Sequence, residues 1–277
     1  MKKLKPGCKH WVIAPALGLS LAVSAHAADT RGNAATSPRS DSTVSRDVAA
    51  TTRAHDLRAS KLIGMEVTNR NGQDLGEIKD LVLDATNGRV QYAVLSFGGI
   101  AGIGDKLFAY PLDQFQIGRD REKLVLNVSE QKLKAAPGFD ARGWPDFNTP
   151  DYRGQVDRYH GSRTTASARF IRGSELLDGD VKDRQNNDIG DIEDVVVNLQ
   201  SGRVHYVAIE FDRAWNPVDR VVAVPWRKVR AEDGRSDLVF QASREQLRGA
   251  PSFERDKWPD WGRDSGFRSN VERYGQI

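Results

Sequence analysis

Cysteine and histidine are scarce in this sequence. Cys8 is the only cysteine in 277 residues, which excludes an intramolecular disulfide framework. No two of His55, His160 and His205 stand at the spacing of metal ligands. The chain also has no serine elbow, no His-Glu-x-x-His motif and no cysteine in a nucleophile motif. We therefore expect a protein that is not an enzyme and that has no catalytic residue, metal site or cofactor.

Long hydrophobic runs are also missing, apart from one near the N-terminus. Residues 11–25 are apolar, but a membrane-spanning helix needs about 20 such residues. Lysines precede the run, and the small residues Ala25 and Ala27 lie at its end and just after it. This order is typical of a secretory signal peptide, here residues 1–27, with cleavage after Ala27. We expect a periplasmic or secreted protein with no stable membrane span after cleavage.

The charge balance changes when the signal peptide is removed. The full chain has 41 lysines and arginines, 38 acids and a net charge of +3. Residues 1–27 hold four of the lysines and none of the acids, so the mature chain has one more acid than it has basic residues. A basic surface for nucleic acid is not indicated, and we expect no nucleic-acid partner. Residues 28–56 lack aliphatic periodicity and predict a disordered leader.

The sequence contains an internal duplication. Residues 60–146 align with residues 174–260 without a gap and with 28 identities in 87 positions, where unrelated sequences would share about four or five. "GRVQYAVLSF" in the first copy returns as "GRVHYVAIEF" in the second. We expect each copy to fold alone, around its own core. The expected boundaries are a first domain at 57–147, a linker at 148–170, a second domain at 171–261 and a C-terminal tail at 262–277.

The pattern within each copy is typical of short antiparallel strands. Asn71-Gly72 and Asn87-Gly88 supply positive-φ turns. The residues that follow each turn alternate between two faces. Ser129 in the first copy predicts a helix N-cap, and Ser243 with Gln246 predicts a capping box in the second. The predicted fold class is all-β, with two tandem small SH3-like barrels, each followed by a short C-terminal helical turn.

The order of these motifs resembles the PRC-barrel family, named after the cytoplasmic domain of the photosynthetic reaction-centre H subunit. The resemblance is carried by Gly76-Glu77-Ile78, by residues 88–92 and by Gly98-Gly99 through Pro111, and it covers residues 60–128 and 174–242. The chain is also similar to the C-terminal barrel of a bacterial ribosome-maturation factor. The resemblance implies a six-stranded barrel used mainly for protein contacts. Export and the mature charge oppose a ribosomal role.

The two copies diverge most in one loop. Residues 98–104 are rich in glycine, but they lead into a strand and lack the Lys-Ser/Thr ending of a phosphate loop. The second copy has "DRAWNPVDR" at 212–220 instead. Because loops on a rigid scaffold often carry binding residues, we predict different partners for the two loops and expect an exposed tryptophan in the second. The candidate partner-binding residues are Gly98, Gly99, Ile100, Ile103, Trp215, Pro217 and Trp226.

Two further patterns have alternative interpretations. The acidic stretch 178–194 has alternating oxygen-bearing residues but lacks the glycine and closing glutamate of a calcium loop, so we interpret it as a solvated hairpin. The aromatic segments at 138–147 and 252–261 share Phe, Trp, Pro and Asp positions. Each segment packs against its own barrel, or the segments form a partner-binding surface together with Trp215 or Trp226.

Three hypotheses about function follow. The first is an exported, non-enzymatic adaptor that binds an unknown protein partner in the bacterial cell envelope. The second, which rests on the family resemblance alone, is an accessory or subunit-like component of an electron-transfer or photosynthetic reaction-centre complex. The third is a small-ligand site between the two barrels, for which the sequence shows no motif.

Overall fold

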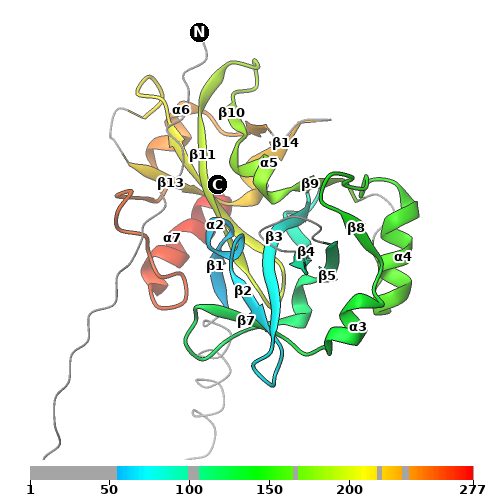
Figure 1. Cartoon of the computed structure of the whole chain (residues 1–277). Helices are drawn as coiled ribbons and strands as arrows, with labels where there is room; N and C mark the ends of the chain where they lie inside the picture. The colour runs from blue at the N-terminus through cyan, green and yellow to red at the C-terminus, as the bar shows by residue number, and fades with distance from the viewer. Residues whose placement is uncertain (1–54, 99–105, 165–167, 217–219, 233–236, 277) are drawn as a thin grey trace, which may run out of the picture. The chain divides into compact units, whose positions relative to one another are not determined.

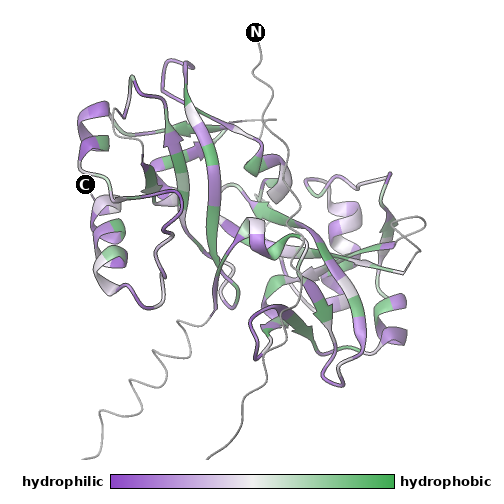
Figure 2. Ribbon diagram, turned by 60° about the vertical axis from the view of Figure 1, so that its left-hand side comes forward, coloured by the Kyte–Doolittle hydropathy of each residue, from purple (hydrophilic) through white to green (hydrophobic). Residues whose placement is uncertain are grey.

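The computed structural model describes residues 55–98, 106–164, 168–216, 220–232 and 237–276. All of them belong to one compact unit, residues 41–277. The chain is mostly β, and each repeat forms a curled sheet with a few short helices (Figure 1). Apolar residues concentrate on the strands, whereas the helices have mixed surfaces (Figure 2). The expected all-β fold of two small barrels is confirmed.

We call β1 to α4 the first half and β9 to α7 the second half. The elements of the first half are β1 (Asp56–Arg58), α2 (Ala59–Leu62), β2 (Glu66–Thr68), β3 (Asp74–Asp84), β4 (Arg89–Phe97), β5 (Lys106–Pro111), the 3-10 helix η1 (Leu112–Gln114), β6 (Phe115–Ile117), β7 (Lys123–Leu126), α3 (Glu130–Lys134), β8 (Gly138–Asp140) and α4 (Pro150–His160). The elements of the second half are β9 (Phe170–Arg172), α5 (Gly173–Leu177), β10 (Asp180–Lys182), β11 (Asp188–Asn198), β12 (Val204–Phe211), β13 (Val221–Val224), the 3-10 helix η2 (Trp226–Lys228), β14 (Val229–Ala231), β15 (Leu238–Phe240), α6 (Arg244–Arg248), β16 (Ser252–Phe253) and α7 (Ser265–Gln276).

The two sheets have the same strand order. It is β6-β7-β2-β3-β4-β5-β8 in the first half and β14-β15-β10-β11-β12-β13-β16 in the second. Neighbouring strands are antiparallel except β2 with β7 and β10 with β15, which are parallel. The expectation of purely antiparallel strands is wrong at these two equivalent pairs. No hairpin joins β2 to β7; the curl of the sheet brings them together.

Local signals in the sequence are confirmed at the turns and caps. Gly72 and Gly88 have φ angles of +77° and +66°, as their Asn-Gly turns require. The Ser129 side chain accepts a hydrogen bond of 3.2 Å from the Lys132 amide at the start of α3. Ser243 and Gln246 form the complete capping box of α6. These contacts fix where each short helix begins.

The linker and the C-terminal tail expected from the sequence contain the two longest helices described. In α4, Pro150 occupies the first turn and Gly161 ends the helix with a φ of +67°, a common arrangement at helix ends. Val156 is its fully buried apolar residue. In α7 the buried residues are Val271 and Tyr274. Their apolar stripes are too narrow for helical periodicity to be obvious in the sequence.

The two halves exchange their first segments. Strand β1 pairs with β11 of the second half, with Leu57 opposite Val197. Strand β9 pairs in the same manner with β3 of the first half, with Ile171 opposite Leu83. Each barrel is thus completed by residues from the other copy. We call residues 56–62 and 170–177 the exchanged segments.

The expected signal peptide and most of the expected leader lie outside the described residues. The last two leader residues, His55 and Asp56, are part of the exchange. The Asp56 carboxylate accepts a hydrogen bond of 2.8 Å from the side-chain amide of Asn198. The backbone amide of Leu199 donates to the His55 carbonyl at 2.8 Å. The start of the first domain, expected at residue 57, therefore lies inside β1; the domain boundaries stay a prediction.

The duplicated Gly-Arg-Val motif joins the two halves. The Val90 amide donates to the Gly202 carbonyl at 2.8 Å, and the Val204 amide donates to the Gly88 carbonyl at 2.9 Å. A Cβ at Gly202 would lie 2.5 Å from the Val90 carbonyl oxygen, so only glycine permits this approach. The residues that the two copies share therefore form the contact between the halves as well as the strands.

Buried apolar residues form one continuous core that runs through both halves. The expectation of a separate core for each copy is wrong, because exchanged residues such as Leu62 and Leu176 belong to this common cluster. Two smaller clusters lie on the outer faces of the barrels. One contains Tyr92 and the other contains Tyr206. Both faces of the central strands are therefore buried.

Candidate functional site

The first predicted loop is largely outside the described residues. Gly98 follows β4 in an exposed position with a φ of +84°. Gly99, Ile100 and Ile103 of the same loop, and Pro217 of the second loop, lie outside the described part of the chain. The structure thus places one residue of the glycine-rich loop, and it places Trp215 of the loop that replaces it.

Trp215 lies in the turn after β12 and is half-buried. Its ring stacks on Phe211 at a centroid distance of 6.4 Å and meets the edge of Phe240 at 6.3 Å. Hydrogen bonds from the Trp215 and Asn216 amides to the Asp212 carbonyl, at 2.8 and 2.9 Å, hold the turn. The tryptophan expected to be exposed in this loop is therefore only partly exposed, because one part of its ring packs on the barrel.

Arg244 also contacts the Trp215 ring, which stays partly exposed. The Arg244 guanidinium lies 5.2 Å from the ring centroid, within range of a cation–π contact. Arg244 is exposed and comes from α6, far from Trp215 in the sequence. This pair could not be predicted from the sequence, because nothing in the capping pattern of α6 indicates which loop the helix faces. Trp215 and Arg244 together form a small amphipathic surface, which we call the Trp215 surface.

Trp226 has a different environment. It lies in η2 and is 9% exposed. A Cβ at Gly88 would fall 2.2 Å from the Trp226 ring, so the ring rests directly on the Gly88 turn of the other half. Most of this side chain is used in the contact between the halves, and little of it is left for a partner.

The aromatic segment after the first barrel packs on its outer face. Phe139 contacts Trp144 at 5.2 Å and Tyr152 at 5.3 Å between ring centroids. Phe147 lies 6.0 Å from Tyr92 of β4. The second segment repeats this with Phe253, Trp258, Trp261 and Phe267 around Tyr206. The interpretation that each segment packs on its own barrel is confirmed.

Each exchanged segment also covers a tryptophan of the other half. The Arg58 guanidinium lies 4.5 Å from the Trp258 ring centroid, and that of Arg172 lies 4.9 Å from Trp144. Trp144 and Trp258 are half-buried. They resemble Trp215 in exposure and in having an arginine partner, and so provide matched controls for it.

The two central tyrosines differ in their polar contacts. The Tyr92 hydroxyl donates to Asp157 at 2.8 Å and lies 2.7 Å from the Thr164 hydroxyl. Burial raises the pKa of Tyr92. Burial also raises the pKa of Tyr206, but among the described residues the Tyr206 hydroxyl has no hydrogen-bond partner. Both hydroxyls therefore stay neutral at physiological pH and have structural roles.

Neither a metal-binding cluster nor a membrane-spanning helix is found among the described residues. No group of three or more His, Cys, Asp or Glu in this part of the chain could hold a metal ion. The turn of the acidic hairpin near residue 183 is held by the Asp183 carboxylate, which accepts hydrogen bonds from the Gln185 and Asn187 backbone amides.

None of the helices described is long and apolar enough to cross a membrane.

Comparison with known proteins identifies one family. The family model described as PRC-barrel domain matches residues 55–128 and 168–244. The two matches begin at the exchanged segments and end beyond β7 and β15. No curated protein matches the chain.

Proposed function

Because the chain belongs to the PRC-barrel domain family, whose members are generally non-catalytic modules, we propose that it acts as a protein-interaction adaptor. The family suggests an interaction module in general terms. We propose further that the second half holds the partner through the Trp215 surface. The two halves act as one body in this role, since they share a core.

The pairing of Trp215 with Arg244 carries this proposal. The ring is half-buried on Phe211 and Phe240, so it is already ordered before a partner arrives. A preordered aromatic side chain binds with a small loss of conformational entropy. Arginine and tryptophan are also the residue types most enriched in interface hot spots. The first half has Ala101 at the position of Trp215 and Glu130 at that of Arg244, so the pair is specific to the second half.

The surface also indicates the chemistry of the partner. The Trp215 ring offers an apolar face, and Arg244 offers donors that pair best with a carboxylate. We propose a partner that places an aromatic or aliphatic side chain on the ring and an acidic side chain beside Arg244.

We propose that this protein works in the bacterial cell envelope. The support is the signal-peptide pattern of residues 1–27. The mature N-terminus is then expected to be Ala28-Asp29-Thr30, and N-terminal sequencing of protein from fractionated cells tests it. Finding Met1 in the membrane fraction would contradict this location.

Affinity purification from native envelopes tests the adaptor role. Wild type, Trp215→Ala and Trp144→Ala are used as baits at equal amounts. We expect a partner that wild type and Trp144→Ala recover and that Trp215→Ala loses. The identity of that partner also distinguishes a general adaptor from an accessory of an electron-transfer complex. Equal recovery by all three baits would contradict the proposed surface.

A further inference from the structure

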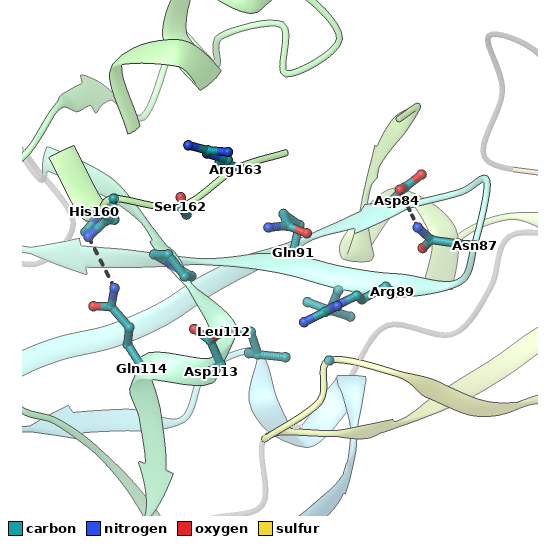
Figure 3. A pocket seen from close by; sticks show the side chains of 14 residues that line it. Asp84, Asn87, Arg89, Gln91, Leu112, Asp113, Gln114, His160, Ser162 and Arg163 are labelled. Carbon is teal, nitrogen blue, oxygen red and sulfur yellow. Dashed lines mark hydrogen bonds between the residues drawn. The ribbon is translucent and has the colours of Figure 1, made fainter. Parts of the chain in front are cut away.

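A polar hollow lies where the first half meets the second. It has a volume of about 420 Å³ and opens between β4, η1, the end of α4 and Gly202 of the second half (Figure 3). This volume lies within the range of small-ligand pockets. The polar groups that matter for its chemistry are Arg89, Gln91, Asp113, Gln114, Ser162 and Arg163.

Two arginines supply positive charge. Arg89 and Arg163 are exposed, and among the described residues neither forms an ion pair with a carboxylate. Gly202 lacks a side chain where the stem of Arg89 passes, since a Cβ there would lie 3.2 Å from Arg89 Cγ. The duplicated glycine thus leaves room for Arg89 beside the hollow.

The acidic groups of the lining differ in availability. Asp84 is 4% exposed and accepts hydrogen bonds from Asn87 at 2.7 Å and from the Thr86 and Arg169 amides at 3.0 and 3.3 Å. Its oxygens are therefore occupied. Asp113 is exposed and can accept from a ligand. The available charges are two guanidinium groups against one carboxylate.

Neutral groups complete the lining. His160 lies with Nε2 at 3.2 Å from the Ala109 carbonyl oxygen and Nδ1 at 3.5 Å from Gln114 Nε2. Burial lowers the pKa of His160, so the ring stays neutral and orients the Gln114 amide. The Gln91 side-chain amide has no hydrogen-bond partner among the described residues. Figure 3 shows Gln91 and Arg89 on the same strand of the hollow's wall.

The equivalent positions in the second half are already paired. His205, which replaces Gln91, lies 2.8 Å from Asp56 and stacks on Trp261. Arg227, which replaces Asp113, donates to the Glu272 and Gly275 carbonyls at 2.8 and 2.6 Å. The second half therefore satisfies these groups internally, whereas the first half leaves them available. The lining side chains of the first hollow are therefore available to a ligand.

We propose that the hollow binds a small organic anion with a carboxylate or phosphate group and an adjacent hydroxyl or amino group. The guanidinium groups of Arg89 and Arg163 hold the anionic oxygens, since their planar donors match both groups. Asp113 accepts from the hydroxyl or amino group of the ligand. The Gln91 amide bonds to the remainder. This inference does not depend on the proposed partner surface.

Isothermal titration at about 50 mM salt tests the proposal, because screening weakens exposed ionic contacts at higher salt. The probes are citrate, glycerol 3-phosphate and inorganic phosphate. We expect saturable binding of one of the two organic anions, weaker binding of inorganic phosphate, and affinity at least tenfold lower in both Arg89→Gln and Arg163→Gln. Asp113→Asn is expected to weaken the organic anion relative to inorganic phosphate, because the variant loses the ionised acceptor for the hydroxyl or amino group together with the negative charge that opposes both anions.

Arg203→Gln is the matched control. Arg203 is the equivalent of Arg89 in the second half, is also exposed and pairs with Arg89 in an isolated β-bridge, but it does not line this hollow. We expect Arg203→Gln to bind like wild type. The proposal is overturned if neither organic anion binds, or if Arg203→Gln weakens binding as much as Arg89→Gln, since the effect would then be general surface charge.

Discussion

Ser60 of the first exchanged segment donates its hydroxyl to Asp194 of β11 at 2.5 Å, and its backbone amide donates to the same carboxylate at 3.1 Å. Ser174 of the second segment bonds Asp80 of β3 in the same manner, at 2.5 and 2.9 Å. Both carboxylates are buried, at 1% and 2% exposure. The two serines therefore satisfy buried charges in the opposite half, and they link the stability of each barrel to the other.

Removing either serine hydroxyl is expected to destabilise the whole chain. Ser60→Ala and Ser174→Ala should each lower the free energy of unfolding by about 1.5–3 kcal/mol, the range for hydrogen bonds to charged groups. Urea unfolding measures this, and each variant should retain one transition because the halves share a core. Ser269→Ala, at an exposed position of α7, should change stability by about 0.5 kcal/mol or less. Two separate transitions in wild type would contradict the shared core.

Gly88→Ala tests the contact between the halves. The new Cβ would meet the Trp226 ring and would be held at a positive φ, so we expect a loss of about 3 kcal/mol or more in unfolding free energy. Gly64→Ala is the control, because Gly64 also has a positive φ but has open space around it, which predicts about 1–2 kcal/mol.

Combining Gly88→Ala with Trp226→Leu completes the test. Leucine stands at the equivalent position of the first half, as Leu112. The double variant should show a favourable coupling energy in chemical denaturation, because the smaller side chain relieves the overlap. Additive effects would show that Gly88 and Trp226 do not touch.

The equivalent tyrosines Tyr92 and Tyr206 should respond differently to the same substitution. Tyr92→Phe removes the contacts with Asp157 and Thr164 and should cost about 1–2 kcal/mol. Tyr206→Phe removes a buried hydroxyl that has no partner among the described residues, so it should be neutral or slightly stabilising. Thermal unfolding of both variants provides the comparison. An equal cost at the two sites would show that the Tyr206 hydroxyl is bonded.

The ionisation of His160 gives a pH prediction. Burial lowers its pKa in the folded state below the ordinary 6.5, so the unfolded chain binds a proton at higher pH than the folded chain does. This group therefore contributes stability that is present above pH 6.5 and is lost as the pH falls from there through the folded pKa. Proton NMR should show its ring titrating below 6.5, with the signal assigned by its loss in His160→Gln. A midpoint above 6.5 would contradict burial of a neutral ring.

Much of the fold could be predicted because the duplication separates the residues that the fold requires, which recur in both copies, from the residues that differ between them. Gly88, Tyr92 and their equivalents recur in both copies, and the structure places them at a turn and in a buried cluster. The exchange could not be predicted. Segments 56–62 and 170–177 each fit either barrel by their sequence, and only the three-dimensional path of the chain decides which barrel each one completes.

The candidate site was predicted less completely, for a related reason. Trp215 could be singled out because the first copy has no tryptophan at the equivalent position. Its environment, however, depends on Phe240 and Arg244, which are distant in the sequence. The hollow beside Arg89 depends on Gly202 of the other half and on Arg163 after α4. Sites assembled from several segments leave no local motif.

Measuring the dissociation constant of the recovered partner for wild type and for Trp215→Ala decides whether the Trp215 surface binds that partner. Trp215→Ala and Trp144→Ala should each lose about 1–2 kcal/mol of stability as half-buried aromatic side chains, so loss of folding does not distinguish them. Trp215→Ala should weaken binding of the partner by about tenfold or more, as truncation of a hot spot does, while Trp144→Ala should bind like wild type. Unchanged affinity in Trp215→Ala, or equal weakening in both variants, would contradict a binding role of the Trp215 surface.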